Sequence, residues 1–517
     1  MQQKKYITIF AIAALAFGSS CKKDYLTLYP EGQINEGNFY KTVTDFQQAL
    51  VGAYVPLRDA ANIGFFLEEM RSDNTEYDYN SKDRGGLGYE QLADFVDDKS
   101  NGVTSQMWTA DFKGIYRTNV ILDRIDKIPT TVIGDADRKQ IIGETKALRA
   151  HYYFELVRLF GKLPLYLHEV KSDAQAFVSR SSVDSVYTQI IADFTDALSL
   201  VAPPSKFPQT GRITKGMVAT ELALAYMTRG QYDKALPLLQ TIEPMGYALL
   251  PNYADVYKLG NKNSTESIFE VQYKAGTDGQ ASFFIYRFIN YTPHTKNILG
   301  VDYNNTVGGW NIPTYDLINT YESGDKRLDA SIGVQWGKVD GSTDFQPDSV
   351  GSILNLTAPA TGTTQKLFVK KQFQPQGYSI NQNTEDNWPV YRFSDVLLML
   401  AECLNETGAT GDALAPLNRV RARAGLNAST ETNKDALRDV IAHERRVELA
   451  FENHRWFDLI RTGKAVTTMN AFGVAQKALH GYLLPSSYNV STNRLIYGIP
   501  FRETQVNPAL GQNDGYN

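Results

Sequence analysis

The chain has 517 residues and a formal net charge of −5, so it is long enough to bury a large core, and its acidic balance argues against nucleic acid as a partner. It contains 30 tyrosines and 25 phenylalanines but only 5 tryptophans, and tyrosine rings suit sugar recognition as well as half-buried packing. There are only two cysteines, Cys21 and Cys403, so stability has to come from the core. Cys403 lies in an apolar run and is interpreted as a small buried hydrophobe.

The N-terminus has the features of a secretory signal. Two lysines precede the apolar run 7–17, which is shorter than the roughly 20 residues that a membrane-spanning helix needs. Small residues then lead to Cys21, and this arrangement resembles the lipobox of bacterial lipoproteins, although a glycine stands where leucine is usual. We therefore expect a signal peptide over 1–20 and a lipid on Cys21 that anchors a tether over 21–40, with ordinary secretion as the alternative.

Apolar residues recur at helical spacing along much of the remaining chain. They predict helices over 44–57, 105–128 and 135–161, and helical pairs over 214–242 and 393–426. In the first pair, alanines permit close helix approach and Gly230 makes the turn, which resembles a tetratricopeptide (TPR) hairpin. A strict repeat of about 34 residues is not visible, so a plain solenoid is not expected. We predict a mainly α fold, a single domain over 41–517 with a scaffold of TPR-like helical pairs.

Two stretches, 72–104 and roughly 244–391, break the helical pattern. They are rich in Gly, Asn, Asp, Thr and Tyr, and the second contains short strand-like runs at 267–273 and 366–373. Loops of this length in a compact domain are usually functional or disordered, and these are too aromatic for simple disorder. We therefore expect large irregular loops with a few short strands, and we expect them to bind the ligand.

The segment HERRVELAFENHRWFDLIRTG, residues 443–463, raises the question of catalysis. A zincin motif needs His-Glu-x-x-His on a helix, but Val447 replaces the second histidine, so we predict no zinc site. Glu444, Glu448 and Glu452 are four residues apart, which places them on one face of a helix. Arginines lie three residues from acids, at 445–448, 452–455 and 458–461, which favours ionised carboxylates over the general acid of a glycoside hydrolase. We predict a buried, salt-bridged helix without a catalytic residue.

This segment also resembles the C-terminal signature of the SusD/RagB family. Ten positions within 444–461 fit the family pattern E-R-x-x-E-L-x-x-E-x-x-R-W-x-D-L-x-R. Further stretches are similar in the same order: the N-terminal cysteine with DYLTLYPEG, the helix and turn TKALRAHYYFELVRLFGKLPL, the pair over 393–426, and the closing segment GIPFRETQVNPALGQNDGY. The resemblance therefore spans nearly the whole chain, although the loops are unmatched.

The resemblance implies an outward-facing, lipid-anchored protein of the cell outer membrane. Such a protein captures a glycan or oligosaccharide and delivers it to a SusC-like TonB-dependent transporter, and some members take peptides instead. It binds its ligand without cleaving it, and the signature helix belongs to its scaffold. We assign no cofactor and no metal; Asp302 and its neighbours lack the spacing of an EF-hand calcium loop.

Sugar sites combine exposed aromatic rings with polar side chains on loops, because C–H faces stack on rings while hydroxyls bind amides and carboxylates. Two parts of the loops fit this description, at 71–89 and 286–316. The candidate ligand-binding residues are Tyr77, Tyr79, Tyr89 and Asn80 from the first part, and Tyr291, Tyr303, Asn305 and Trp310 from the second. Trp310 follows two glycines and is expected on a flexible turn. We predict that Tyr79, Tyr303 or Trp310 stacks on a sugar, whereas Trp108 lies in a helix and fills the core.

Three other functions remain open from the sequence. A peptide-binding receptor keeps the same fold with a different ligand. A surface glycoside hydrolase needs an unpaired loop acid, for which Asp78 or Glu385 is a candidate. A TPR adaptor predicts tight binding of a protein partner and no small ligand.

Overall fold

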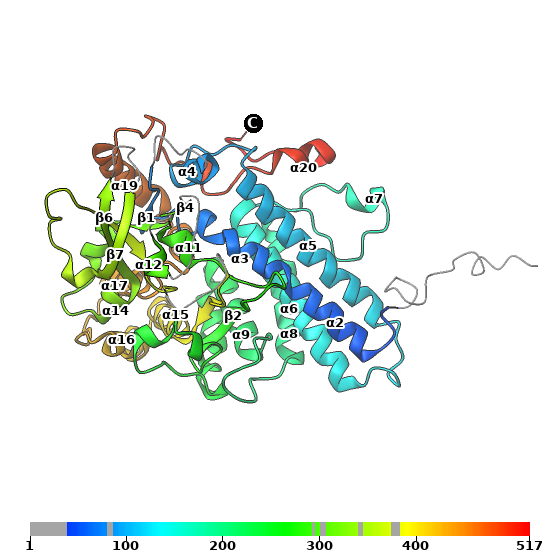
Figure 1. The fold of residues 1–517 in the computed structure, drawn as a ribbon. Coiled ribbons are helices and arrows are strands. Elements are labelled where there is room, and N and C mark those ends of the chain that lie inside the picture. The colour runs from blue at the N-terminus through cyan, green and yellow to red at the C-terminus, as the bar shows by residue number, and fades with distance from the viewer. Residues whose placement is uncertain are drawn as a thin grey trace, which may run out of the picture.

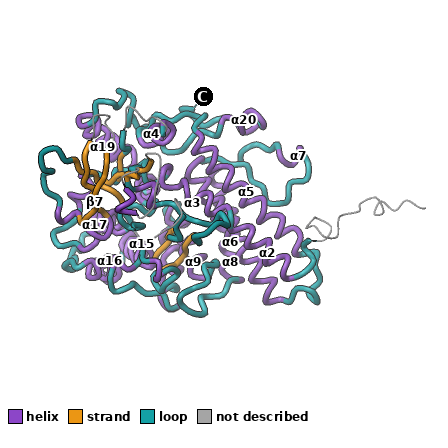
Figure 2. Tube along the Cα trace, viewed as in Figure 1, coloured by secondary structure: helices purple, strands orange, loops and turns teal. Residues whose placement is uncertain are grey.

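The computed structural model describes residues 39–79, 86–291, 295–299, 307–339, 345–373 and 383–516, and the structural statements below concern these residues. The predicted signal peptide, Cys21 and nearly all of the predicted tether lie outside them. Helices dominate and strands are short, which confirms the predicted mainly α fold (Figure 2).

The first half of the chain forms long helices, most of which lie side by side in Figure 1. They are α2 (Val43–Tyr54), α3 (Pro56–Leu67), α5 (Gly102–Ile125), α6 (Asp135–Phe160) and α8 (Val183–Leu200). Local sequence sets their ends. Thr42 and Asp45 form a capping box at the start of α2, with Asp45 N donating to Thr42 Oγ1 at 3.2 Å and Thr42 N donating to Asp45 Oδ2 at 2.9 Å. Gly161 ends α6 with a φ of +72°, a backbone conformation that favours glycine.

The rest of the chain contains the helical pairs that the sequence predicts. Its main helices are α9 (Lys215–Thr228), α10 (Tyr232–Gln240), α15 (Phe393–Glu406), α16 (Thr410–Ala424), α17 (Lys434–Glu448), α18 (Arg455–Arg461) and α19 (Ala465–Leu479). Helix α9 packs on α10 and α15 packs on α16, and Gly230 makes the first turn with a φ of +68°. Ala219, Ala223 and Ala225 are fully buried, so small side chains do bring these helices close together.

Short elements fill the two loop-rich stretches. The strands are β1 (Thr75–Glu76), β2 (Ser267–Val271), β3 (Asn290–Tyr291), β4 (Val307–Gly308), β5 (Ile312–Pro313), β6 (Ile332–Val339), β7 (Phe345–Ser352), β8 (Thr364–Val369) and β9 (Trp388–Arg392). Strands β7, β6 and β8 form an antiparallel sheet in that order, and β2 pairs with β9. Strand β2 confirms the strand-like run at 267–273, whereas β8 ends at Val369 and covers only the first four residues of the run at 366–373. The short helices are α4 (Leu87–Ala93), α7 (Asp173–Ala176), α11 (Ile285–Phe288), α12 (Lys296–Leu299), α13 (Tyr315–Thr320), α14 (Lys326–Ser331) and α20 (Phe501–Val506).

One hydrophobic cluster connects the helices, with members from Phe46 to Leu510. Trp108 is 4% exposed and meets Phe160 edge-on with ring centroids 5.2 Å apart, so its predicted packing role is confirmed. Cys403 is a fully buried free thiol, as expected of a small hydrophobe. Among the described helices, none has the length and apolar character that crossing a bilayer requires.

The charged segment 443–463 is buried and salt-bridged as predicted, but it is not one helix. Helix α17 ends at Glu448 and α18 begins at Arg455, and between them Phe451 and Asn453 have a φ of +68°. The three glutamates therefore do not share one helix face, which corrects the prediction. The turn is fixed because the Glu69 carboxylate accepts hydrogen bonds from Phe451 N at 2.9 Å and Asn453 N at 3.0 Å.

The arginine partners also differ from the predicted spacing. Only Arg461 and Asp458 form the expected pair, at 2.8 Å. Glu448 instead binds Arg392 at 2.9 Å and Arg327 at 3.2 Å, both from other elements. Burial alone would raise the pKa of Glu448, but Arg423, Arg392 and Arg327 hold it well below its ordinary value. The prediction of ionised, non-catalytic carboxylates is thus supported by partners distant in sequence.

Candidate functional site

The two predicted parts of the ligand surface lie side by side although they are more than 200 residues apart. Strand β1 pairs antiparallel with β5, with Thr75 opposite Pro313 and Glu76 opposite Ile312. Thr314 N extends this contact by donating to Asn74 O at 3.0 Å. In Figure 1, α4, β1, β4 and α11 gather at one end of the molecule, beside α19. The pairing brings rings from both stretches onto a common surface.

Three rings form the centre of this surface. Tyr89, on α4, stacks on Phe66 with ring centroids 3.9 Å apart and an angle of 8° between the rings. Trp310 lies 4.8 Å from Tyr89 and 5.4 Å from Phe66, tilted against both rings. Phe66 is 2% exposed and forms the floor, whereas Tyr89 and Trp310 are half-buried. Each of these two rings thus combines firm support with access from solvent.

Glycines place Trp310 against this floor. Gly308 and Gly309 have φ values of +81° and +66°. A Cβ atom on Gly308 would lie 2.1 Å from Ile289 O, so only glycine fits this approach. Gly309 N donates to Ile289 O at 3.0 Å, and Trp310 N donates to Arg287 O at 2.9 Å. The turn that the glycines predict is therefore tied to α11 by backbone hydrogen bonds.

A second pair of rings continues the surface. Tyr79 stacks on Tyr482 with ring centroids 4.0 Å apart and an angle of 5° between the rings. Tyr482 Oη donates to Tyr77 O at 3.4 Å, and the Tyr77 ring packs against Gly86 immediately before α4. We call Phe66, Tyr79, Tyr89, Trp310 and Tyr482 the aromatic surface.

Charged and polar groups border the aromatic surface. The Arg287 guanidinium lies over the Trp310 ring, 4.9 Å from its centroid. Asp78 forms an ion pair with Lys366 from β8 and accepts a hydrogen bond from Asn290 Nδ2 at 3.2 Å. Sugar hydroxyls can donate to such a carboxylate and accept from such an ammonium group, while the rings stack on C–H faces. The arrangement has the chemical requirements of a sugar-binding surface.

The other candidate residues fall into two groups. Tyr77 is 7% exposed, so its ring packs beneath the surface and is not open to a ligand. The backbone of Tyr291 is in β3, but its side chain, together with Asn80, Tyr303 and Asn305, lies outside the described residues. From the predicted set, the structure thus places Tyr89 against Trp310, and Tyr79 in a separate stacked pair with Tyr482.

The sequence did not reveal Phe66, Tyr482, Arg287 or Lys366 as members of this site. Phe66 is part of an apolar helix, and Tyr482 follows α19, about 400 positions after Tyr79. Lys366 carried a weak signal, because it begins a strand-like run and would face a neighbouring strand. These contacts depend on the pairing of segments that are distant in the chain. Local patterns in a single sequence do not show which segments pair.

The two loop acids that a hydrolase could use lie near cations. Asp78 binds Lys366, and Glu385, which is 44% exposed, lies 3.9 Å from Lys262. A carboxylate in such a pair can still accept hydrogen bonds from sugar hydroxyls.

The fold and the surface together define a class: a scaffold of TPR-like helical pairs with an aromatic surface built from its loops. Two family models match the chain, one described as "SusD family" over 265–516 and one as "Starch-binding associating with outer membrane" over 24–227. The chain belongs to the SusD-like family.

Individual relatives are distant but cover nearly the whole chain. "SusD-like protein P25" from Formosa agariphila is 26% identical, and the alignment covers 99% of both chains. "Starch-binding protein SusD" from Bacteroides thetaiotaomicron is 23% identical over 78% of this chain and 76% of its own length. A solved structure named "Laminarin binding SusD-like protein" is 27% identical with a TM-score of 0.73, and covers 92% of this chain and 100% of that one.

Proposed function

We propose that this chain is a cell-surface glycan-binding protein that holds an oligosaccharide on the aromatic surface. The observation that carries the proposal is the pairing of β1 with β5, which brings Tyr89 and Trp310 together over Phe66 and beside Arg287. Two half-buried rings at an angle to each other suit the faces of successive sugar units. The Asp78–Lys366 pair supplies groups for hydroxyls at the edge.

Relatives support a glycan as the ligand. One curated relative is named for starch and one solved relative is named for laminarin. Both of these polysaccharides are built from linked glucose units. We propose a glucan or a similar neutral oligosaccharide as the first ligand to test. The chain's own net charge of −5 also disfavours strongly acidic polysaccharides.

The proposal includes an outward-facing lipid anchor at the outer membrane and a SusC-like TonB-dependent transporter as partner. The N-terminal signal and Cys21 support the anchor, and the family described as associating with the outer membrane supports the location. Lipid attachment can be tested in cells by incorporation of a labelled fatty acid. Label in the wild type that disappears in Cys21→Ser supports the anchor, and equal label in both contradicts it.

Partnership with the transporter calls for a separate experiment. The protein is purified from detergent-solubilised membranes with and without the candidate glycan, and its stable partners are identified by mass spectrometry. A TonB-dependent transporter recovered in stoichiometric amount supports delivery to the barrel. Recovery of the lipoprotein alone, from membranes that contain the transporter, contradicts it.

Ligand binding is tested by titration calorimetry of the full chain. Oligosaccharides from laminarin and starch are compared with a mixed peptide library, and the products are checked for new reducing ends. We expect binding of at least one glycan without cleavage. Binding of peptides alone establishes the alternative receptor function, and release of reducing ends establishes a hydrolase. Binding of neither, beside a tight protein partner, establishes an adaptor.

The site itself is tested with the triple variant Tyr79→Ala, Tyr89→Ala and Trp310→Ala. We expect affinity to fall at least tenfold, or about 1.4 kcal/mol, because the stacking area is lost. Tyr116→Ala is the matched control, since Tyr116 is 48% exposed and lines a separate hollow of 370 Å³ along α5. A loss in Tyr116→Ala with full affinity in the triple variant would move the site to that hollow.

A further inference from the structure

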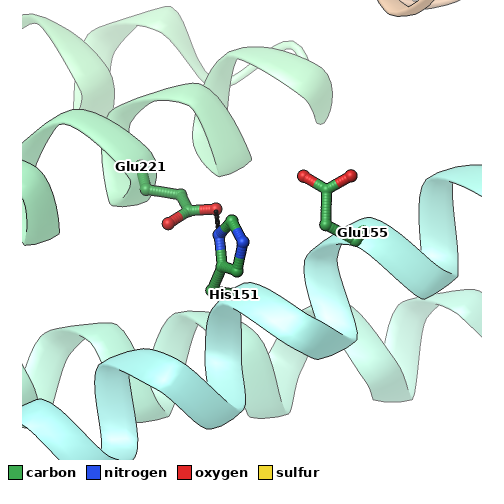
Figure 3. A group of neighbouring side chains, drawn as sticks. All are labelled: His151, Glu155 and Glu221. Carbon is green, nitrogen blue, oxygen red and sulfur yellow. Dashed lines mark hydrogen bonds and ion pairs between the residues drawn. The ribbon is translucent and has the colours of Figure 1, made fainter. Parts of the chain in front are cut away.

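A buried polar cluster lies between helices α6 and α9, and the proposed glycan site does not use it. His151 and Glu155 are one turn apart on α6, and Glu221 faces them from α9 (Figure 3). His151 Nδ1 lies 2.8 Å from Glu221 Oε1. One ligand atom from each of the three residues lies within 4.8 Å of the others, and this is the one such group of three among the described residues. The three side chains therefore converge on a common point inside the scaffold.

The surroundings of this cluster contain more acid than base. Glu68 and Asp111 add two carboxyl groups from α3 and α5, while Arg158 adds a cation that pairs with Glu155. Four acids thus face two cationic groups, His151 and Arg158. Burial and the Glu155 carboxylate raise the pKa of both Glu68 and Asp111. The cluster therefore gathers more carboxyl groups than cationic groups.

Some of the buried carboxylate oxygens at this cluster lack a hydrogen-bond partner among the described residues. Asp111 is fully buried, and neither of its carboxylate oxygens has a hydrogen-bond partner among the described residues. The same holds for Glu221 Oε2, which is also fully buried. Buried carboxylates without partners are costly and are usually explained by a proton, a water or an ion. A small hollow of 70 Å³ lies beside the cluster and is lined by Glu68, His151 and Glu155.

We propose that His151, Glu155 and Glu221 bind a divalent transition-metal cation, with Asp111 and Glu68 completing its charge balance. One imidazole with carboxylates suits Zn²⁺ or Mn²⁺ better than Ca²⁺, which prefers oxygen ligands alone. The three ligand atoms lie no more than 4.8 Å from one another, and rotation of the long glutamate side chains can bring them to the roughly 2.1 Å bonds that such an ion makes. The ion would clamp α6 to α9.

A proton competes with the metal at the imidazole. Burial lowers the pKa of His151, but the adjacent Glu221 outweighs it and raises the pKa to about 9. His151 Nδ1 lies 2.8 Å from Glu221 Oε1, so a bound cation has to displace this contact.

The test uses the full chain purified without a histidine tag. Its metal content is measured by mass spectrometry, and Zn²⁺, Mn²⁺, Ca²⁺ and Mg²⁺ are titrated into chelator-treated protein by calorimetry. We expect one equivalent of Zn²⁺ or Mn²⁺ to bind with a rise in unfolding temperature. His151→Gln and Glu155→Gln should each weaken binding by at least tenfold, since even outer ligand partners contribute about that much.

His168→Gln is the matched control. His168 Nδ1 lies 2.9 Å from Asp123 Oδ1, but no third ligand group completes that pair within the described chain, so its loss should leave metal binding unchanged. If His151→Gln does not fold, Glu155→Gln decides alone, because glutamine keeps the shape of a side chain that is 13% exposed. No binding of any of the four cations by the wild type, or equal affinity in wild type and Glu155→Gln, overturns the proposal and assigns protons to the carboxyls. Glycan affinity is measured separately, so failure here leaves the proposed function untouched.

Discussion

The charged segment 443–463 and the aromatic surface differ in almost every physical property. The segment concentrates acids and arginines, yet Glu444, Glu448 and Glu452 are at most 3% exposed and are held by cations from other elements. The aromatic surface has few charges, and its Tyr89 and Trp310 rings are only half-buried, so a ligand can reach them from solvent. The segment therefore supplies rigidity, and the surface supplies recognition.

The difference teaches that dense charge in a sequence is weak evidence for chemistry. A carboxylate that buried cations hold in its ionised form has no proton to donate to a substrate. A ring supported on one side and open on the other can bind a ligand without reorganisation.

The largest expected effect is on stability. Glu448→Gln removes the charge that neutralises Arg392 and Arg327 inside the core, and breaking such a buried pair costs about 3–5 kcal/mol. We expect a much lower free energy of unfolding, measured by denaturant titration, with unchanged glycan affinity in the protein that remains folded.

Glu243→Gln is the matched control, because Glu243 pairs with Arg419 at 2.7 Å but is 54% exposed. Exposed pairs contribute about 1 kcal/mol or less, so this variant should be nearly as stable as the wild type. Normal stability with lost glycan binding in Glu448→Gln would assign the charged segment to the site and break the comparison.

A second effect appears with pH. Burial raises the pKa of Glu452, but Arg392 and Lys371 outweigh it and lower the pKa to about 2, from 4.5 for the free side chain. Because the folded pKa is the lower one, the stabilisation is complete above pH 4.5 and is lost as the pH falls towards 2. The loss is about 3 kcal/mol at most. Glu452→Gln should be less stable at pH 7 and should lack this part of the pH dependence, as measured by calorimetry.

The sequence predicted the scaffold better than the site. Helical periodicity identified α5, α6 and the two later pairs because each helix is fixed mainly by its own residues and caps. Burial of the charged segment followed from its composition. The break in the helix at Leu449 and the ion-pair partners of the segment did not follow from its composition, because Glu69 and Arg392 are distant in sequence.

The site was predicted only in part for the same physical reason. Tyr79, Tyr89 and Trp310 were recognisable as aromatic residues on polar loops, but Tyr77 could not be told apart from them although it is buried. Tyr482 was missed because nothing near it in the chain marks it as a partner of Tyr79. Contacts between distant loops depend on tertiary packing that local patterns do not report.

A smaller effect is expected from Gly309→Ala. The added Cβ would lie 2.3 Å from Asn290 Nδ2, and a φ of +66° is unfavourable for alanine, so the turn has to shift and carry Trp310 with it. We expect glycan affinity to fall by about 1–2 kcal/mol, roughly five- to thirtyfold, with little change in global unfolding. Gly362→Ala is the control: its φ is +82°, but no atom lies within 4 Å of its added Cβ. Equal affinities in both variants would show that the position of Trp310 does not matter.

The smallest expected effect concerns Arg287, whose guanidinium lies 4.9 Å from the centre of the Trp310 ring. Arg287→Gln removes a cation–π contact of about 0.5–1 kcal/mol, so glycan affinity should fall two- to fivefold by calorimetry. Arg287→Lys keeps the charge and should retain part of the affinity. If Arg287 only orients the indole, added salt will not change the difference between Arg287→Gln and the wild type, because the contact is short and partly shielded. If the arginine instead attracts an anionic group on the ligand, the difference will shrink as salt rises, and the ligand must then be sought among acidic glycans.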